Sequence, residues 1–326
     1  MAEESQTTAN DDLVTEALIL ALLVDRYAIG LQNAAGARLA RLRSDIISII
    51  ARNDPTAPAR LNDRANRLQK VTEESNALVK SAYTELNREI RTALRTLAEI
   101  VEESTVRQAG EVVGADIFTR RSEPEELRSL ADNAVIMGAI LKVWLERHAG
   151  DLQFRINTAL QNLFVRRQSL GDILDVVRGS ENSGGADGVI GLSMRRVAVL
   201  LMAAAHAVSN RTRDALFKRH EEMVRGWLHY SRIDERTTDT CRIRHLRRWT
   251  LDGEPIDHNV PFLGPAPLHW GCRSIVVPVL LDYNSLPAKI RRQVSPDRFT
   301  SEPSRETDEP PRNNQPISAR EFRNSV

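Results

Sequence analysis

Residues 61–101 read LNDRANRLQKVTEESNALVKSAYTELNREIRTALRTLAEIV, and apolar side chains recur along this stretch in steps of three and four residues. They are Leu61, Ala65, Leu68, Val71, Leu78, Ala82, Leu86, Ile90, Ala93, Leu97 and Val101. This spacing places the apolar residues on one face of an α-helix. Sustained over such a length, it predicts a helix of roughly 65–70 Å at 1.5 Å per residue.

A second apolar stripe precedes this one and ends around Arg52. Asn53-Asp54-Pro55 and Pro58 lie between the two stripes and predict a turn, because proline cannot continue a helix. The earlier stripe comprises Leu13, Ala17, Leu20, Val24, Tyr27, Leu31, Ala34, Ile46 and Ile50. We therefore expect residues 1–110 to form a long antiparallel helical hairpin, closed by Gly110 and Gly114.

The prolines separate a helical part from the rest of the chain. Only Pro55, Pro58 and Pro124 precede residue 250, out of fourteen prolines in all. We expect a helical middle region over 111–188 that ends in the loop SENSGGADG, residues 180–188. Another long helix is expected from Leu192 to Trp227. The predicted fold class is thus mainly α.

The composition changes after Trp227, and a small α+β module is expected within 189–283. Leu251-Asp252-Gly253 carries an Asp-Gly turn signal between short extended runs. The run from Ser274 to Leu281 predicts a strand, and Pro278 suits a sheet edge. The Pro-, Ser- and Arg-rich residues 284–326 are expected to form a disordered tail.

The overall composition narrows the classes of function. Of the 326 residues, 41% are hydrophobic, which is enough for a packed core. Only 5% are aromatic, and this low share does not favour a β-sandwich. The formal charge of +1 provides no whole-chain attraction to nucleic acid. Two cysteines exclude a disulfide-rich scaffold. The acidic start MAEESQTTANDD does not resemble a signal peptide, and we expect a soluble protein without a membrane partner.

The two cysteines belong to a group of candidate metal ligands. Cys241 and His245 are separated by three residues, and His269 and Cys272 by two. Short-spaced pairs of thiolates and imidazoles joined by a loop suit a tetrahedral zinc ion. Two alternatives stay open at this point: the thiols are reduced and buried, or Cys241 and Cys272 form a disulfide.

A basic run lies around Cys241. Basic side chains beside an aromatic residue, here Trp249, can bind phosphates or stack on bases. Neighbouring Asp234, Glu235 and Asp239 could instead neutralise the basic charges locally, and no nucleic-acid-binding motif accompanies them. A DNA-binding accessory protein is one alternative function on this basis. The basic residues are Arg242, Arg244, Arg247 and Arg248.

Sequence motifs of enzymes are scarce. Only one of the seven histidines, His220, is followed two places later by glutamate, and the Pro-Cys-x-x-Cys segment that a zinc deaminase also requires is absent. The chain has no GxSxG, Walker A or HExxH motif. A hydrolase that uses zinc or the Cys272 thiol, with His245 or His269 as base, is the other alternative. We expect no enzyme.

The order of motifs from residue 190 to 283 resembles the C-terminal domain of the Mu F-like minor head proteins, the phage head morphogenesis family. Trp227 is followed by SRIDERTTDTC, which ends at Cys241, and then by LDGEPID around Gly253. The segment PLHWGCR, from Pro267 to Arg273, is the most specific part. Asp234 matches the aspartate of the family motif. The family often has a second cysteine three places after the first, where this chain has Arg244, so His245 is a possible substitute ligand.

The resemblance implies a virion protein that resides in the head interior or at the portal vertex. Such proteins are present in several copies per particle, are made in the host cytoplasm, and act in head assembly, DNA packaging or ejection. The implied partners are the portal protein, capsid or scaffolding protein, and packaged DNA. The helical hairpin and a flexible tail are compatible with these roles.

Overall fold

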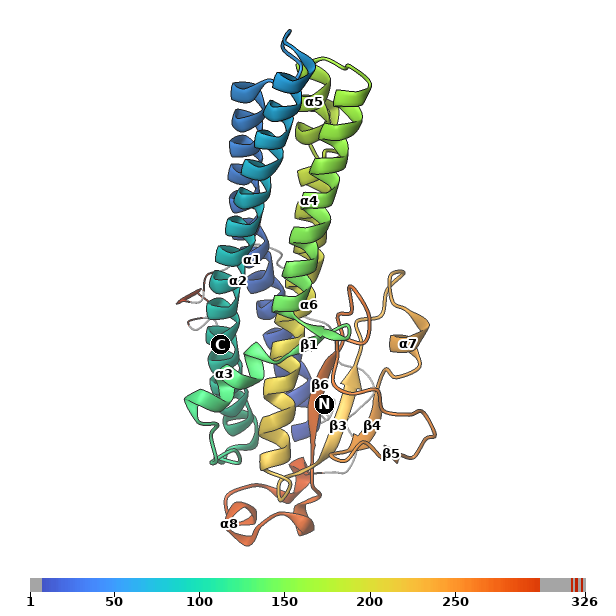
Figure 1. The fold of residues 1–326 in the computed structure, drawn as a ribbon. Helices are drawn as coiled ribbons and strands as arrows, with labels where there is room; N and C mark the ends of the chain where they lie inside the picture. Colours follow the sequence, from blue (N-terminus) through green and yellow to red (C-terminus); the bar gives the residue numbers. More distant parts are fainter. Residues whose placement is uncertain (1–7, 300–317, 319, 322–323, 325–326) are drawn as a thin grey trace. The chain divides into compact units, whose positions relative to one another are not determined.

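A computed structural model describes residues 8–299, 318, 320, 321 and 324. The fold is mainly α, as predicted, and 65% of it is helical (Figure 1). The α-helices are α1 (Ala9–Asn53), α2 (Leu61–Val113), α3 (Pro124–Asp132), α4 (Leu141–Val165), α5 (Leu170–Arg178), α6 (Val189–Arg219), α7 (Asp239–Arg242) and α8 (Ala288–Arg291). The strands are β1 (Val135–Ile136), β2 (Ala139–Ile140), β3 (Val224–Tyr230), β4 (Arg247–Thr250), β5 (Pro255–Ile256) and β6 (Ile275–Leu280).

The predicted helical hairpin is confirmed in α1 and α2. In the turn between them, the Asp54 carboxylate accepts hydrogen bonds from the backbone N–H and the hydroxyl of Thr56, at 2.9 and 2.6 Å. Gly114 follows the last residue of α2 with φ of +75°. Glycine adopts this left-handed conformation without steric penalty, so it ends the helix.

The buried face of α2 differs from the predicted stripe in the first part of the helix. Val79 and Tyr83 are buried there, whereas Leu78 and Ala82 are only half-buried and Leu61 is 69% exposed. From Leu86 onward the predicted residues are buried, apart from Ala93, which is half-buried. The predicted stripe omitted Tyr83 because hydrophobic spacing alone does not distinguish two adjacent faces when both carry apolar residues.

The chain forms two compact units whose segments are interleaved. We call one the sheet unit, which comprises Met1–Gly30, Ala93–Gly138 and Met202–Val326. The other, the helical unit, comprises Leu31–Thr92 and Ala139–Leu201. Because α1, α2 and α6 each contribute residues to both units, these do not coincide with the consecutive segments 1–110, 111–188 and 189–283 expected from the sequence.

The helical unit contains α4 and α5 together with parts of α1, α2 and α6. Ser169 and Asp172 form a capping box at the start of α5. Before α6, a loop packs backbone against backbone, and a Cβ at Gly179, Gly188 or Gly191 would lie within 2.6 Å of neighbouring atoms. The predicted loop at 180–188 is confirmed, and its backbone is tightly packed.

The sheet unit is built around four antiparallel strands in the order β5-β4-β3-β6. The Asp-Gly turn before β5 and the strand at β6 are confirmed. The predicted helix to Trp227 is wrong, since α6 ends at Arg219 and Trp227 lies on β3. The β3 sequence VRGWLHY is rich in strand-forming residues, and a Cβ at Gly226 would lie 2.0 Å from the Trp249 carbonyl oxygen.

Strand β6 is an edge strand, as Pro278 predicted, and helix side chains cover its outer edge. The Asn210 side chain on α6 donates to the Ser274 carbonyl and accepts from the backbone N–H of Val276. Asn10 on α1 accepts from the backbone N–H of Leu280. These amides satisfy backbone groups that would otherwise be available for pairing with another chain.

The first part of the predicted disordered tail, residues 284–299, is instead folded. Leu286, Ile290 and Phe299 are buried in the core of the sheet unit, and α8 lies among them. The proline-rich composition gave no sign that this segment packs against the core, because only three of its apolar residues are buried there. Within the tail, 300–317, 319, 322–323 and 325–326 lie outside the described residues.

Among the described helices, α6 alone has the length and apolar composition needed to cross a membrane. Its most apolar window of 18 residues has a mean hydropathy of 1.5, and 56% of that window is buried within the fold. Burial of this kind is also found in the core helices of soluble proteins. The expectation of no membrane partner stays a prediction.

Candidate functional site

Three of the four predicted metal ligands converge in the sheet unit: Cys241, His269 and Cys272. Tyr230 at the end of β3 pairs with Ile275 at the start of β6. The chain that leaves β3 and the chain that enters β6 therefore lie at the same end of the sheet. The first supplies Cys241 on α7, and the second supplies the other two ligands.

The distances within this cluster are short. The Cys241 and Cys272 Sγ atoms are 3.6 Å apart, and Cys241 Sγ is 3.1 Å from Nε2 of His269. All three ligand atoms lie within 4.8 Å of one another. In a tetrahedral zinc site with Zn–S of about 2.3 Å and Zn–N of about 2.0–2.1 Å, the corresponding S···S and S···N separations are about 3.8 and 3.5 Å. The cluster could therefore hold a metal ion.

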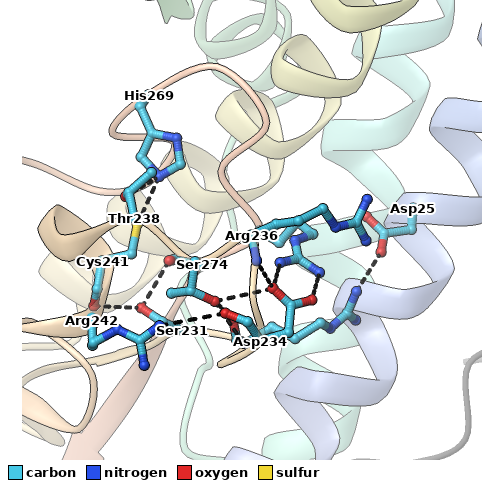
Figure 2. Close-up of polar contacts among 12 residues, drawn as sticks. Asp25, Ser231, Asp234, Arg236, Thr238, Cys241, Arg242, His269 and Ser274 are labelled. Atoms are coloured by element: carbon cyan, nitrogen blue, oxygen red, sulfur yellow. Dashed lines mark hydrogen bonds and ion pairs between the residues drawn. The ribbon is translucent and has the colours of Figure 1, made fainter.

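The orientation of His269 suits a metal ligand. Its Nδ1 lies 2.9 Å from the Trp270 carbonyl oxygen, which can only accept a hydrogen bond. Nδ1 must then carry the proton, and the lone pair of the neutral ring is on Nε2, which faces Cys241. The Thr238 hydroxyl is 2.9 Å from the same Nε2 (Figure 2).

Of the two buried thiols, Cys272 loses its proton more readily than Cys241. A hydrogen bond from Cys241 lowers the pKa of Cys272 well below its usual range, although burial opposes this. The same hydrogen bond, together with burial and the charge on Cys272, raises the pKa of Cys241. A cation favours the doubly deprotonated pair, because metal binding displaces protons from thiols.

The disulfide alternative does not describe this structure, in which both cysteines are free. Their sulfur atoms stand well beyond the 2.03–2.05 Å of a disulfide bond.

Buried polar contacts support the segment that carries Cys241. The Ser231 hydroxyl donates to the Cys241 carbonyl at 3.0 Å and lies 3.0 Å from the hydroxyl of Ser274.

His245 is not part of the cluster, so its prediction as a ligand is wrong. Its Nδ1 accepts a hydrogen bond from the backbone N–H of Ser231 at 3.2 Å, and its ring meets Tyr230 edge-on at 4.9 Å. α7 ends at Arg242, and the chain continues in tighter turns, in which the backbone N–H of His245 donates to the Arg242 carbonyl three residues earlier. The four-residue spacing from Cys241 therefore does not place both side chains on one face.

The four arginines predicted to bind nucleic acid do not form one basic surface. Arg244 is buried and donates to the carbonyl oxygens of Thr240 and Pro261. Arg248 pairs with the Asp257 carboxylate at 3.0 Å. Arg242 and Arg247 remain exposed. Internal hydrogen bonding, which the sequence does not reveal, removes half of the predicted patch.

The remaining motif residues have structural roles in the sheet unit. Asp234 receives two hydrogen bonds from the Arg273 guanidinium, which hold the pKa of the Asp234 carboxyl well below its usual range. Trp227 is buried and stacks on Phe262, with ring centroids 4.5 Å apart. Gly253 has φ of +91°. Pro267 follows the buried Ala266, which packs against both cysteines.

A pocket of about 520 Å³ adjoins the cysteine cluster within the sheet unit. His269 of the cluster lines the pocket together with Thr238, whose hydroxyl contacts it, so the cluster forms part of the pocket wall. Three guanidinium groups, one carboxylate and several apolar side chains complete the lining. The residues are Asp25, Ile29, Met202, Arg232, Arg236, Thr238, His269, Trp270, Gly271 and Arg273.

A buried polar network holds one side of this pocket and was not predicted. The Asp25 carboxylate on α1 lies 2.7 Å from Nε2 of His206 on α6 and 3.3 Å from Nη1 of Arg232. Burial alone would raise the pKa of Asp25, but the hydrogen bonds and charges of His206 and Arg232 outweigh it and lower the pKa. The sequence signal was a polar residue among the apolar residues of each helix, Asp25 in α1 and His206 in α6. The sequence does not show that these two residues are in contact.

The substitution Asp25→Asn is expected to lower the free energy of unfolding by about 1–3 kcal/mol at pH 7, because it removes a buried charge that His206 and Arg232 require. Since the folded-state pKa of Asp25 is depressed, its stabilisation is present above the unfolded pKa of about 3.9 and is lost as pH falls through the folded pKa. The difference between wild type and variant should therefore shrink below about pH 4. Urea denaturation across pH measures this.

Asp116→Asn is the matched control, because Asp116 is an exposed aspartate in the same unit. It should change the stability by no more than about 0.5 kcal/mol. An Asp25→Asn protein as stable as this control would show that the network contributes nothing.

Comparison with known protein families, curated proteins and solved structures finds no match to this chain.

Proposed function

We propose that the chain is a minor head protein of a tailed bacteriophage that binds the portal and serves head assembly, DNA packaging or ejection without being an enzyme. The observation that carries the proposal is the convergence of the motif that suggested it. Asp234 and Arg273 form an ion pair, and Cys241 and Cys272 lie side by side, although each pair is far apart in sequence. Residues that carry the resemblance thus act as one structural unit.

The proposal includes zinc as the metal of the Cys241, His269 and Cys272 cluster. Two thiolates and an imidazole are the ligands that zinc prefers among common cellular metals. A bound zinc ion would link α7 to the segment before β6 and would stabilise the sheet unit. In this role the metal is structural, and the residues around it orient the ligands: Trp270 fixes the tautomer of His269, and Ser231 fixes the backbone of Cys241.

The experiment that tests the portal role is coexpression of the full chain with the portal protein encoded in the same genome. The proposal predicts that the chain co-elutes with assembled portal rings in size-exclusion chromatography, in several copies per ring. A portal protein from an unrelated phage is the matched control and should not retain the chain. Elution of the chain only at its own volume, with intact portal rings present, would contradict the proposal.

A further inference from the structure

We propose that the pocket beside the cysteine cluster binds a nucleoside phosphate, with the phosphate on its arginines and the base on Trp270. The inference rests on the lining of this pocket and does not depend on the portal role. It concerns different residues from the basic run at 242–248, of which half is engaged within the fold.

The charge of the pocket favours an anion. Arg232, Arg236 and Arg273 bring three guanidinium groups to one cavity. Two carboxylates stand against them: Asp25 pairs with Arg232, and Asp234 pairs with Arg273. The balance is one positive charge in excess. Arginine forks match the geometry of phosphate oxygens, which makes phosphate the anion of choice here.

The two carboxylates also hold their arginines in place. The side chains of Arg232 and Arg273 are only 9% and 17% exposed, and each is fixed by an aspartate. A guanidinium has five N–H donors, so an arginine that gives one or two of them to a carboxylate can still donate to a ligand. Because these side chains are ordered before binding, a ligand does not have to restrict them.

Arg236 has no evident structural role in the fold. Its side chain is exposed on the pocket wall, and no hydrogen bond or ion pair of this guanidinium occurs among the described residues. Its backbone N–H donates to the Asp234 carboxylate (Figure 2), which also accepts hydrogen bonds from Arg273. Arg236 is thus free to close on an anion that the two fixed arginines receive.

The aromatic side of the pocket suggests what the phosphate is attached to. Trp270 lines the pocket and is 42% exposed, although tryptophan is usually highly buried. Ile29 and Met202 add apolar surface to the same lining. An indole face next to a cluster of arginines can stack a base while the phosphate is bound. A free nucleotide and the end of a DNA strand share this chemistry.

The test is titration calorimetry of the full-length protein with dAMP and with inorganic phosphate. We expect saturable binding of both, with dAMP bound more tightly. Arg236→Gln should weaken both ligands about tenfold or more, because it removes charged hydrogen bonds. Trp270→Ala should weaken dAMP by about five- to hundredfold and leave phosphate unchanged, because it removes only the stacking. Both side chains are exposed, so both variants should remain folded.

Arg247→Gln is the matched control, since Arg247 is an exposed arginine of the same unit outside the pocket. It should bind both probes as the wild type does. A single-stranded oligonucleotide with a 5′-phosphate, compared with the same strand without it, separates the two sources: preference for the phosphorylated strand over dAMP indicates a DNA end, and the reverse indicates a free nucleotide. Absence of saturable binding at millimolar probe concentrations, or equal binding by Arg236→Gln and Arg247→Gln, would overturn the proposal.

Discussion

Replacement of Trp227 by alanine is expected to lower the free energy of unfolding by about 3–5 kcal/mol, the range for truncation of a large buried aromatic side chain. Trp227 is 2% exposed on β3 and stacks on Phe262. Its partner across the sheet is Trp249, which is fully buried. Alanine would leave a cavity between β3 and the loop that carries Phe262. Urea or thermal denaturation of the full chain measures the loss.

Trp270→Ala is the control for this experiment. Trp270 lies in the same unit but is 42% exposed, so its removal should cost clearly less stability than the removal of Trp227. If the two variants lose the same stability, Trp227 is not the core residue described here. If Trp227→Ala is as stable as the wild type, the packing of β3 against Phe262 is wrong.

Acidification is expected to destabilise the sheet unit through His229. This histidine on β3 is 1% exposed, and burial, followed by the charges of Arg244 and His245, lowers its pKa to about 3. The unfolded chain binds the proton at a pKa of about 6.5. Stability is therefore retained above pH 6.5 and falls by about 1.4 kcal/mol per pH unit between pH 6.5 and 3, for a total of about 4–5 kcal/mol.

His229→Leu isolates this contribution, because leucine fills the buried site and does not titrate. The variant should show a flatter dependence of unfolding free energy on pH below 6.5, and the difference from the wild type should grow as pH falls. Equal slopes for both proteins would mean that His229 is accessible to protons in the folded state. Denaturation curves at matched ionic strength provide the comparison.

The helical hairpin and strand β6 could be predicted because their signals are local. Apolar residues every three or four positions define a helix wherever it packs, and Asp54-Pro55 ends one helix on any tertiary background. The position of Trp227 could not be predicted in this way. VRGWLHY follows a long helix without a proline, and only the close approach of Gly226 to Trp249 reveals a strand.

The interleaved units were beyond sequence reasoning for a related reason. A helix as long as α1 looks uniform along its length, yet its first part packs in the sheet unit and its last part in the helical unit. Contacts between distant segments, such as Asp25 with His206, decide this division. Periodicity shows that a face is buried but does not show against which segment.

Sequence spacing predicted three of the four candidate metal ligands correctly. His269 and Cys272 lie close in sequence, and the cysteine pair was the natural partner for them. His245 was chosen because it lies four residues from Cys241, a spacing that works only in a continuing helix. Since α7 ends at Arg242, that assumption fails. The arginine-lined pocket was missed because it combines residues from α1, α6 and two loops.

The metal content of the full-length protein, purified without chelators, tests the central claim most directly, namely that Cys241, His269 and Cys272 bind a metal ion that stabilises the sheet unit. Elemental analysis by mass spectrometry should find about one zinc ion per chain in the wild type and almost none in Cys241→Ser. His245→Ala should retain the metal, because His245 lies outside the cluster. A wild-type protein without bound metal, in which both thiols react freely, would contradict the claim.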